Sequence, residues 1–511
     1  MSEKCDVHHG KSHCLNKVSQ RIALIEPAVD AECLITEIFW QIRCSLSFLS
    51  YSLHEQGWET QLFHEEILNI DNRIEFIASH FPIAGISVTI NTISRAVEIA
   101  RKLKAVNNGI FIIFGGITAP HYSSILLGIG DCVIQGPGEA VLMEVVTNCG
   151  NSDYLRTIPG LIIKDSNNTP VFTDQNTSFI DHPCRFEDIH GFGGFSEKRN
   201  ILGLRKPPLY SLFFSTGCVN RCKFCMSDRQ YRIRKVDNVM ADLNSILRFH
   251  KTPLPPRIML VDDCPFGNMA IFSNLLKEFQ HKRKSRKFDL LMQFHIRPIL
   301  ENPEILKSMR QAGVTTLLLG METTSAKSLE SQAKGTKPED HLKVLQQCRN
   351  NGITPYGYFM AGFETDTPET IISVFDFIIK NRMVAQVLPM GIMSPEMAGC
   401  TIQSPSIRWT DSRMKSLDPF SFGASMKVSH RHPLISPPEL QKMLIAGYDR
   451  IYSWKRVFTM SSAREMVYQS LFSLAWRKWR KGLLTHLNYL RLLHNFSVMS
   501  TSPKLNINEK Q

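Results

Sequence analysis

Three cysteines stand close together in the stretch Ser215-Thr-Gly-Cys-Val-Asn-Arg-Cys-Lys-Phe-Cys-Met226. Cys218, Cys222 and Cys225 have the spacing C-x3-C-x2-C, and the other cysteines of the chain form no such cluster. Three thiolates on a short loop can hold three irons of a cubane iron–sulfur cluster, which normally takes four cysteines. One iron would then lack a protein ligand, so a small molecule could coordinate it and receive an electron. The spacing predicts an open iron–sulfur site.

Two other uses of these cysteines have to be weighed, a structural zinc site and a disulfide framework. A zinc site takes four ligands, usually in two pairs, but no histidine falls between Gly217 and Gln230, and Cys184 and Cys264 stand alone in the sequence. The 13 cysteines are sparse and odd in number, which argues against a disulfide framework. Both alternatives are therefore less favoured than the iron–sulfur site.

The cysteine stretch opens a series of alternating strand-like and helix-like segments. The strand-like runs are residues 210–214, 257–261, 290–295, 315–319, 357–360 and 385–390. The helix-like segments between them are residues 236–249, 269–281, 303–312, 339–350 and 370–381. This pattern predicts a partial parallel (β/α)6 barrel rather than a closed eightfold one, with its chemistry at the carboxyl ends of the strands.

A second α/β unit precedes this barrel. Short apolar runs at residues 22–25, 60–63, 83–88, 110–114 and 132–134 alternate with helix-like stretches such as residues 93–106. They predict a doubly wound, flavodoxin-like parallel sheet. Ligands of such sheets bind beyond the carboxyl ends of the strands. The candidate ligand loops are therefore Ser87-Val-Thr89, Gly115-Gly116 and Gly136-Pro-Gly-Glu139.

The sequence thus divides into five regions. The divisions expected are a disordered polar leader at 1–20, the doubly wound domain at 21–150, a linker with a hairpin at 151–208, the partial barrel at 209–430 and a helical C-terminal region at 431–511. Because the leader has no apolar core, it is not a secretory signal, and we expect a cytoplasmic protein.

The cysteine spacing, with Phe224 inside the last pair, resembles the signature of the radical S-adenosylmethionine (SAM) superfamily. The three loops of the preceding unit resemble the cobalamin-binding domain that often comes before a radical SAM domain. The resemblance is to class B radical SAM methyltransferases and related anaerobic cyclases, and it implies three cofactors: a [4Fe-4S] cluster, SAM and cobalamin. It implies cobalamin contacts at Ser87, Thr89, Gly115, Gly116, Gly136 and Glu139. It implies SAM contacts at Phe224, Asp262, Asp263, Arg297, Glu322 and Gly362.

Most of these residues also have a purely structural interpretation. Asp262 could cap a helix, Glu322 could partner a buried basic residue, and Gly362 could serve a turn. The loops of the first domain could likewise be ordinary strand-end turns. Paired glycines and hydroxyls nevertheless suit a bulky ligand that approaches the backbone closely.

The resemblance implies methylation of an unactivated carbon of a small-molecule or lipid substrate. Three alternatives compete with it. The first is an oxidative cyclase or rearrangement enzyme that uses the same cofactors without methyl transfer. The second is a methylthiotransferase, which would carry a further three-cysteine set in its first domain; this chain has none. The third is a non-catalytic iron–sulfur or zinc binding module.

Charge and the C-terminal region bear on partners. The formal net charge is +12, concentrated at residues 281–287 and 477–481. The first segment is either a solvated end of a helix or a docking patch for an acidic electron donor of the flavodoxin or ferredoxin type; it lacks the aromatics of a nucleic-acid surface. No apolar run is long enough to span a bilayer. An apolar stripe on the C-terminal helix predicts packing on the barrel mouth or, alternatively, peripheral membrane contact. It consists of Phe472, Trp476, Trp479, Leu483, Leu487 and Leu490.

Overall fold

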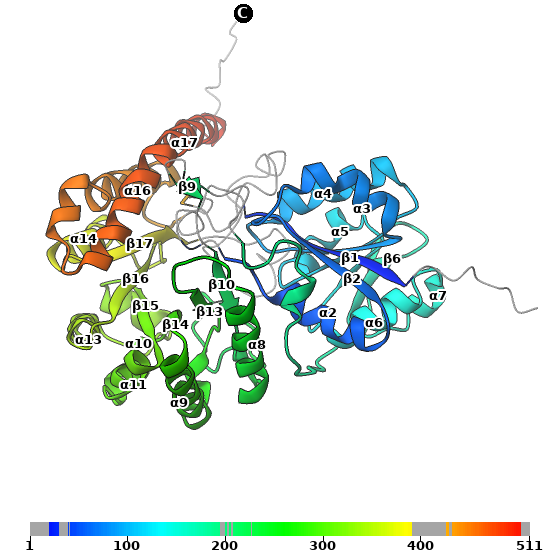
Figure 1. Ribbon diagram of the computed structural model, residues 1–511. Coiled ribbons are helices and arrows are strands. Elements are labelled where there is room, and N and C mark those ends of the chain that lie inside the picture. Colours follow the sequence, from blue (N-terminus) through cyan, green and yellow to red (C-terminus); the bar gives the residue numbers. More distant parts are fainter. Residues whose placement is uncertain are drawn as a thin grey trace, which may run out of the picture.

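The computed structural model describes residues 20–29, 39, 41–194, 200–201, 204–205, 208–225, 227–390, 426–428 and 432–501. Two parallel sheets with flanking helices form two lobes that lie side by side (Figure 1). Both expected sheets are therefore present. The expected leader, apart from its last residue, lies outside the described residues.

The first sheet has the strand order β2-β1-β3-β4-β5-β6-β7. Its strands are β1 (Arg21–Glu26), β2 (Glu59–His64), β3 (Ile83–Ser87), β4 (Phe111–Gly115), β5 (Cys132–Ile134), β6 (Leu161–Lys164) and β7 (Pro170–Phe172). The first five run parallel, which confirms the doubly wound sheet. The hairpin expected in the linker is β6–β7, and it extends this sheet as an antiparallel edge.

Helices cover both faces of the first sheet because the connections between its parallel strands must cross over it. They are α2 (Ser45–Glu55), α3 (Ile74–His80), α4 (Ile93–Val106), α5 (Ser123–Leu126), α6 (Glu139–Thr147) and α7 (Ser152–Leu155). Short 3-10 turns occur at η1 (Ile70–Arg73), η2 (Ala119–Tyr122) and η3 (Phe186–Asp188). In α4, the apolar residues at helical spacing are the buried ones, as the periodicity predicts.

The second sheet has six strands in sequence order, and all five neighbouring pairs are parallel. Its strands are β10 (Leu209–Leu212), β13 (Arg257–Leu260), β14 (Asp289–Phe294), β15 (Val314–Glu322), β16 (Thr354–Ala361) and β17 (Val384–Pro389). The helices that follow them are α8 (Val236–Phe249), α9 (Met269–Ser285), α10 (Ile296–Glu301), α11 (Ile305–Ala312), α12 (Ala326–Ser331), α13 (Pro338–Asn350) and α14 (Pro368–Lys380). The short turn η4 (Pro265–Gly267) precedes α9, and a small hairpin, β8 (Asn200–Ile201) with β9 (Leu204–Arg205), precedes β10. This is the predicted partial (β/α)6 barrel.

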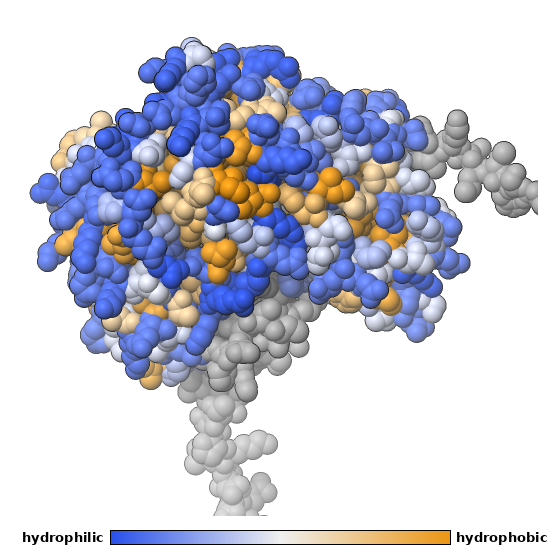
Figure 2. All heavy atoms as spheres, turned by 90° about the horizontal axis from the view of Figure 1, so that it is seen from below, coloured by the Kyte–Doolittle hydropathy of each residue, from blue (hydrophilic) through white to orange (hydrophobic). Residues whose placement is uncertain are grey.

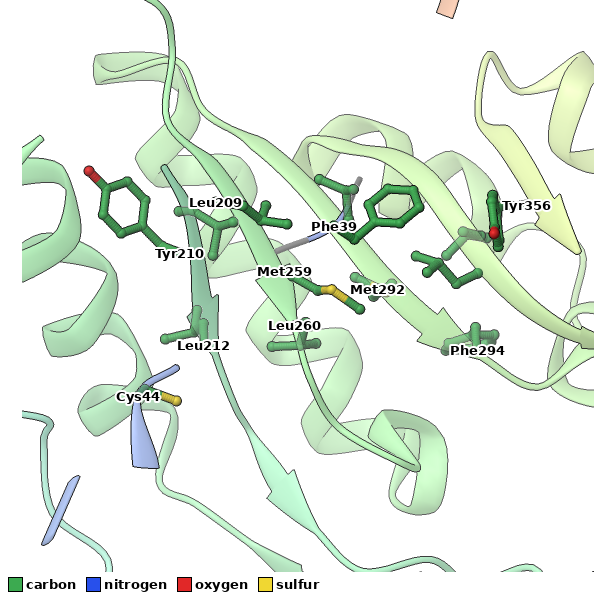
Figure 3. Packing of buried hydrophobic residues seen from close by; sticks show 14 of the residues in the cluster. Phe39, Cys44, Leu209, Tyr210, Leu212, Met259, Leu260, Met292, Phe294 and Tyr356 are labelled. Atoms are coloured by element: carbon green, nitrogen blue, oxygen red, sulfur yellow. The ribbon is translucent and has the colours of Figure 1, made fainter. Parts of the chain in front are cut away.

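The core of the barrel receives a side chain from the first lobe. Phe39 is buried and its ring lies 5.4 Å from the ring of Tyr356 and 5.4 Å from that of Tyr468. Figure 3 shows Phe39 beside Met259 and Met292 of β13 and β14. The two lobes therefore share one continuous hydrophobic core.

Backbone pairing and a buried arginine also join the lobes. Ile42 bridges to Tyr210 at the free edge of β10, and the Cys44 N–H donates to the Ser211 hydroxyl at 2.8 Å. Arg234 is fully buried and pairs with Asp242 at 2.8 Å, while it also binds the segment that links the lobes. These contacts hold the two sheets in one arrangement.

The C-terminal region is helical, as predicted, with α16 (Pro437–Ile451), η6 (Trp454–Thr459) and α17 (Ala463–Thr501). All six residues of the apolar stripe are buried, which confirms packing within the protein. The sequence analysis expected this helix to pack on the barrel mouth, but the structure places the start of α17 at the other end of the barrel. Tyr468 contacts Arg257 and Thr316, which start β13 and β15, so the first turns of α17 cover the end of the barrel opposite its mouth.

The surface and the helix lengths bear on membrane contact. None of the helices in the described segments combines the length and the hydropathy that a bilayer crossing demands. Seen from below, the surface is largely hydrophilic, with hydrophobic residues in small groups across its middle (Figure 2).

Candidate functional site

The three cysteines lie on the loop of a small hairpin at the carboxyl end of β10. Its strands are β11 (Ser215–Thr216) and β12 (Arg232–Ile233), which pair antiparallel. Gly217 opens the loop with φ 73°, and a Cβ there would overlap the carbonyl oxygen of Gln230. The hairpin therefore places the thiols at the mouth of the barrel, as the sequence predicts.

Arg229, to which the sequence analysis assigned no role, fixes the backbone of this loop. The Arg229 guanidinium donates to the carbonyl oxygens of Asn220 at 2.6 Å, Cys222 at 3.2 Å and Cys225 at 3.0 Å. Because one planar group ties three points of the loop together, the directions of the cysteine side chains are set before any cluster binds.

Backbone donors point at two of the three sulfurs. The Asn220 N–H donates to Cys218 Sγ at 3.4 Å, and the Ser227 N–H donates to Cys225 Sγ at 3.5 Å. Such bonds favour the thiolate. Burial acts in the opposite direction at the third sulfur, where it raises the pKa of Cys222. Hydrogen bonds to cluster sulfurs are one of the means by which a protein adjusts the potential of an iron–sulfur cluster.

A fourth thiol lies beside this loop. Cys264, which stands alone in the sequence, is fully buried just after β13, and its thiol lies close to that of Cys218. This neighbouring thiol is the main cause that lowers the pKa of Cys218 to about 6. The sequence-based view of Cys264 as isolated is therefore wrong, because two strand ends that are adjacent in the sheet bring the two residues together.

The donor set fits a cluster better than a single ion. All three cysteines of the loop are free thiols. Among the described residues, no three histidine, cysteine or acidic side chains converge on one metal position. A zinc ion requires such convergence, whereas the cysteines of a cubane each bind a different iron and stand farther apart.

The predicted residue Glu322 closes β15 in an unusual conformation. Its φ is 63°, a region that bulky side chains rarely adopt. Its carboxylate accepts a hydrogen bond from Lys334 Nζ at 2.6 Å, and both side chains are buried. The structural interpretation of Glu322 as the partner of a buried base is confirmed. Backbone strain of this kind is often held at functional sites.

Lys334 also faces the cysteine loop. Its ammonium lies 5.9 Å from the centroid of the predicted residue Phe224, and its charge acts to lower the pKa of Cys222. The sequence analysis missed Lys334. The pair Lys334-Gly335, which follows a short helix, could have marked this position as a turn with a basic side chain.

The connection between α12 and α13, residues 332–337, forms a second wall of the loop. The Lys223 N–H donates to the Gln332 carbonyl at 3.1 Å. The guanidinium of Arg297, another predicted residue, donates to the Asn220 side-chain oxygen at 2.5 Å. Phe224, Arg297 and Glu322 therefore lie around the cysteine loop, and their contact with SAM stays a prediction.

The two aspartates after β13 differ in their surroundings. Asp262 is buried, and its carboxylate accepts hydrogen bonds from the backbone N–H groups of Phe214 and Ser215 and from the Ser215 hydroxyl. Burial nevertheless raises its pKa to about 7. Asp262 thus fastens the start of the hairpin to the second strand. Asp263 is exposed beside Ser227 of the cysteine loop, where its carboxylate can still receive a ligand.

Gly362 begins a turn at the end of β16. It has φ 95°, and its N–H donates to Asp366 at 2.9 Å. The next residue, Phe363, meets Phe224 edge to face with ring centroids 5.8 Å apart. The turn interpretation of Gly362 is confirmed, and the same turn brings an aromatic wall against the cysteine loop.

The predicted cobalamin residues gather at the carboxyl ends of neighbouring strands of the first sheet. Ser87 ends β3, Gly115 ends β4, and Val88 donates to the Gly115 carbonyl at 2.7 Å. Thr89 follows directly, and its N–H is satisfied by Thr92 Oγ1 at 2.9 Å.

The glycines of these loops serve two different purposes. A Cβ on Gly116 would come within 2.5 Å of the Val88 carbonyl oxygen, and one on Gly136 within 2.8 Å of the Asn176 carbonyl oxygen. These two glycines allow another segment of the protein's own backbone to pack closely against them. A Cβ on Gly115, in contrast, would approach the protein only to 3.9 Å, at Ile134, so this position leaves space for a ligand.

Glu139 is a buried carboxyl without a hydrogen-bond partner for one of its oxygens. It starts α6, and no group among the described residues bonds Oε2. Burial raises the pKa of Glu139 to about 7, against a smaller opposing effect of Arg232. The segment Asn176-Thr177 links the Glu139 loop to the hairpin of the cysteine loop, because Asn176 donates to the Pro137 carbonyl at 3.1 Å and Arg232 donates to the Thr177 carbonyl at 3.4 Å. An unsatisfied polar atom and an open glycine together fit a bulky polar ligand.

We expect Glu139 to make the unfolding free energy depend on pH. Its folded pKa of about 7 exceeds the reference value of 4.5, so the folded chain keeps a proton that the unfolded chain releases between these values. Stability therefore falls as pH rises from 4.5 toward 7. Glu139→Gln removes this loss, so the variant should be more stable than the native protein at pH 8 by about 1–3 kcal/mol and equal to it near pH 4.5.

Urea unfolding at several pH values measures this difference. Glu144→Gln, on the exposed side of the same helix, is the matched control. Identical pH profiles for the two variants would contradict the assignment to the buried carboxyl.

Acidic side chains that the sequence analysis missed hold the loop after β1. Glu65 accepts from the Ala28 N–H at 2.9 Å, and Glu66 accepts from the Val29 N–H at 3.1 Å. Arg95 Nη2 in turn binds Glu65 at 2.7 Å. These contacts shape the edge of the sheet next to the glycine loops.

Comparison with known proteins gives a family model that matches part of the chain, several distant relatives and a shared fold. The model of the radical SAM superfamily matches residues 212–378. An uncharacterized methyltransferase of Pyrococcus horikoshii is 25% identical over 309 residues, which are 58% of this chain and 64% of that protein. The hopanoid C-3 methylase of Methylococcus capsulatus is 26% identical over 274 residues, 51% of this chain and 49% of the methylase. The chain thus spans 64% of the length of the first relative and 49% of the second.

A solved structure extends the likeness to both lobes. The radical SAM methyltransferase TsrM of Kitasatospora setae, determined with cobalamin and a [4Fe-4S] cluster bound, superimposes with a TM-score of 0.65. The alignment covers 93% of this chain and 100% of TsrM at 17% identity. At this identity, the comparison establishes that the fold is shared.

Proposed function

We propose that this chain, whose residues 212–378 match the model of the radical SAM superfamily, is a cobalamin-dependent radical SAM methyltransferase. Its substrate would be a small molecule or lipid that is methylated at an unactivated carbon. The observation that carries the proposal is the cysteine hairpin: three free thiols, a loop fixed by Arg229, and SAM-type residues on the neighbouring strand ends.

The chain's own residues would divide the work. Cys218, Cys222 and Cys225 would hold a [4Fe-4S] cluster, and the glycine loops with Glu139 would hold cobalamin. When bound, the cluster supplies the electron for reductive cleavage of SAM, and the corrinoid supplies the methyl group. The protein itself would position the reactants and exclude water from the site.

The residues around the cysteines suit SAM. Asp263 offers a carboxylate to its amino group, and the exposed Arg297 guanidinium offers donors to its carboxylate. Phe224 and Phe363 form an apolar wall that would shield the sulfonium from water. Glu322, fixed by Lys334, would accept hydrogen bonds from ribose hydroxyls.

Anaerobic reconstitution tests the proposal. The purified chain is loaded with iron, sulfide and hydroxocobalamin, then reduced in the presence of SAM labelled on its methyl group. Iron, corrinoid and 5′-deoxyadenosine are quantified, and label is followed into products from hopanoid, tetrapyrrole and peptide candidates. Labelled product supports methylation, whereas 5′-deoxyadenosine with an unlabelled, oxidised product would favour the cyclase alternative. A chain that binds the cluster but never cleaves SAM would be a binding module.

The glycine pair after β4 provides a separate test of the cobalamin half. Gly116→Ala should lower the unfolding free energy by about 1–3 kcal/mol, because of its φ of 107° and the clash with Val88. Gly115→Ala should fold like the native protein, because the nearest atom is 3.9 Å away. If a corrinoid lies against Gly115, the added methyl group weakens its binding by about tenfold or more.

Absorbance titration with hydroxocobalamin measures the second effect, and urea unfolding measures the first. Native corrinoid affinity in a well-folded Gly115→Ala protein would speak against the proposed position of the ligand.

A further inference from the structure

The residues that lead into α16 contact the turn after β16 through one histidine. His432 is buried, with 8% of its surface exposed. Its Nδ1 accepts hydrogen bonds from the N–H groups of Leu434 and Ile435, both at 3.1 Å. Because Nδ1 accepts, the ring hydrogen is on Nε2, which donates to the Phe363 carbonyl at 2.7 Å. One side chain therefore joins the start of the C-terminal region to the barrel mouth.

The two ring nitrogens of His432 serve different parts of the molecule. The bonds to Nδ1 close a local turn just before Ser436, which caps α16 by accepting from the Glu439 N–H. The start of a helix needs no more than such local bonds. The Nε2 bond leaves this turn and ends on a residue 69 positions earlier in the sequence. We therefore assign the Nε2 bond to the barrel rather than to α16.

The backbone of Phe363 is held on both sides. Its N–H donates to Asp366 Oδ2 at 3.1 Å, and its carbonyl accepts from the Asp366 N–H at 2.8 Å. The Asp366 carboxylate is fixed in turn by the Ser328 hydroxyl at 2.8 Å. His432 adds a hydrogen bond from outside this turn. Together these bonds fix the direction of the Phe363 ring, which meets Phe224 edge to face.

Both helices of the C-terminal region hold residues just before His432. The side chain of Gln441, on α16, accepts from the Val428 N–H at 2.8 Å and donates to the Met426 carbonyl at 3.3 Å. The His486 ring, on α17, lies 2.9 Å from the Val428 carbonyl. The C-terminal region therefore acts on the barrel mouth through His432, a residue to which the sequence analysis assigned no role.

We propose that His432 is a positioning residue for SAM, which acts by holding Phe363 in the aromatic wall beside the cysteine loop; this inference rests on the function proposed above. SAM has a flat adenine ring and a sulfonium cation, and aromatic rings attract both when they are held in the right place. Loss of the Nε2 bond frees the Phe363 ring to move, so SAM affinity falls. The cysteines and their hold on a cluster stay unchanged, because His432 does not contact them.

Two substitutions separate the roles of the two nitrogens. His432→Asn keeps an acceptor near the position of Nδ1, as in the turns that Asn forms with the backbone two residues on, but its amide is too short to reach Phe363. His432→Gln has the length to donate to the Phe363 carbonyl. His250→Asn is the matched control, because the His250 ring also lies 2.7 Å from a carbonyl, that of Leu254. His250 ends α8, where the chain turns back to the start of β13, away from the barrel mouth.

Binding, turnover and backbone exchange are measured separately. Every variant is reconstituted anaerobically, and its iron content and urea midpoint are checked first. Equilibrium dialysis then gives the SAM affinity, and the change in the electron paramagnetic resonance signal of the reduced cluster is followed as SAM is added. Formation of 5′-deoxyadenosine gives KM for SAM and kcat. Hydrogen–deuterium exchange of residues 362–366 is followed in the cluster-free protein.

His432→Asn should bind SAM about tenfold more weakly, and the turn at 362–366 should exchange about fivefold to tenfold faster, because a buried hydrogen bond is lost. Its iron content should stay native and its kcat should stay within about twofold, so the loss falls on KM. His432→Gln and His250→Asn should bind SAM within about threefold of the native protein.

Native SAM affinity in His432→Asn, or equal losses in His432→Asn and His432→Gln, would overturn the proposal. A native protein that assembles no cluster or binds no SAM would instead refute the proposed function. The exchange experiment does not depend on the cluster, so unchanged exchange in His432→Asn would show in either case that His432 does not hold Phe363.

Discussion

Cys222→Ala is expected to abolish both the cluster and SAM cleavage. Under the proposed function, three cysteines hold a cubane that normally takes four, and two remaining thiolates cannot hold it. Cys222 is also the one cysteine of the loop that is fully inside, with its carbonyl bound by Arg229. We expect iron content near zero after reconstitution, and 5′-deoxyadenosine formation reduced by more than about a hundredfold, since even outer-shell changes at metal sites cost 10–100-fold.

Cys348→Ala is the matched control for this loss. Cys348 is another buried free thiol, on α13. Its replacement should cost about 1 kcal/mol of stability and leave the iron content native. Iron, acid-labile sulfide and absorbance near the cluster bands are measured on both variants. A cluster that still forms with Cys222→Ala would show that another thiol substitutes for it, and Cys264, which lies close to Cys218, would be the first to replace next.

Lys334→Met is expected to destabilise the protein by about 3–5 kcal/mol, because it leaves the Glu322 carboxylate buried without its partner. The side chains of Lys334 and Glu322 are only 6% and 11% exposed. The double variant Lys334→Met/Glu322→Leu should recover most of this loss, since replacing both members of a buried pair is often neutral. Under the proposed function, the double variant folds but binds SAM poorly, which separates stability from ligand binding.

The control for this prediction is the same substitution in an exposed pair. Lys343 lies 3.7 Å from Asp340 with its side chain 64% exposed, so Lys343→Met should change stability by less than about 1 kcal/mol. Urea unfolding of the cluster-free protein compares the three variants, and equilibrium dialysis measures SAM. If Lys334→Met and Lys343→Met cost the same, the pair at the barrel mouth contributes nothing through its burial.

Much of the fold could be predicted from the sequence because its signals are local. Apolar runs of strand length alternate with helical periodicity over most of the chain, and the six-stranded parallel sheet follows from that alternation. The cysteine spacing is equally local: three ligands on one loop need no tertiary information. The sequence did not predict which sheet the hairpin β6–β7 would join. The edge that a hairpin joins depends on strands that are remote in the sequence.

The position of the C-terminal helix shows a further limit. The apolar stripe of α17 correctly indicated burial, but periodicity only says that one face is covered. It does not say by what, and Tyr468 reaches the opposite end of the barrel from the one expected. In the same way, Asp262 follows the second strand as predicted, yet its carboxylate serves the backbone at Phe214 and Ser215.

The amino-acid sequence by itself determined the two α/β units, their order and the cluster of three cysteines on one loop, because each of these depends on residues that are neighbours along the chain. The tertiary structure alone decided that Cys264 lies close to Cys218, that Lys334 pairs with Glu322 beside the cysteine loop, and that the Glu139 loop is linked to Arg232 through residues 176–177. Such contacts join strand ends that lie 12 to 93 residues apart in the sequence, and only the closing of the sheets makes them neighbours.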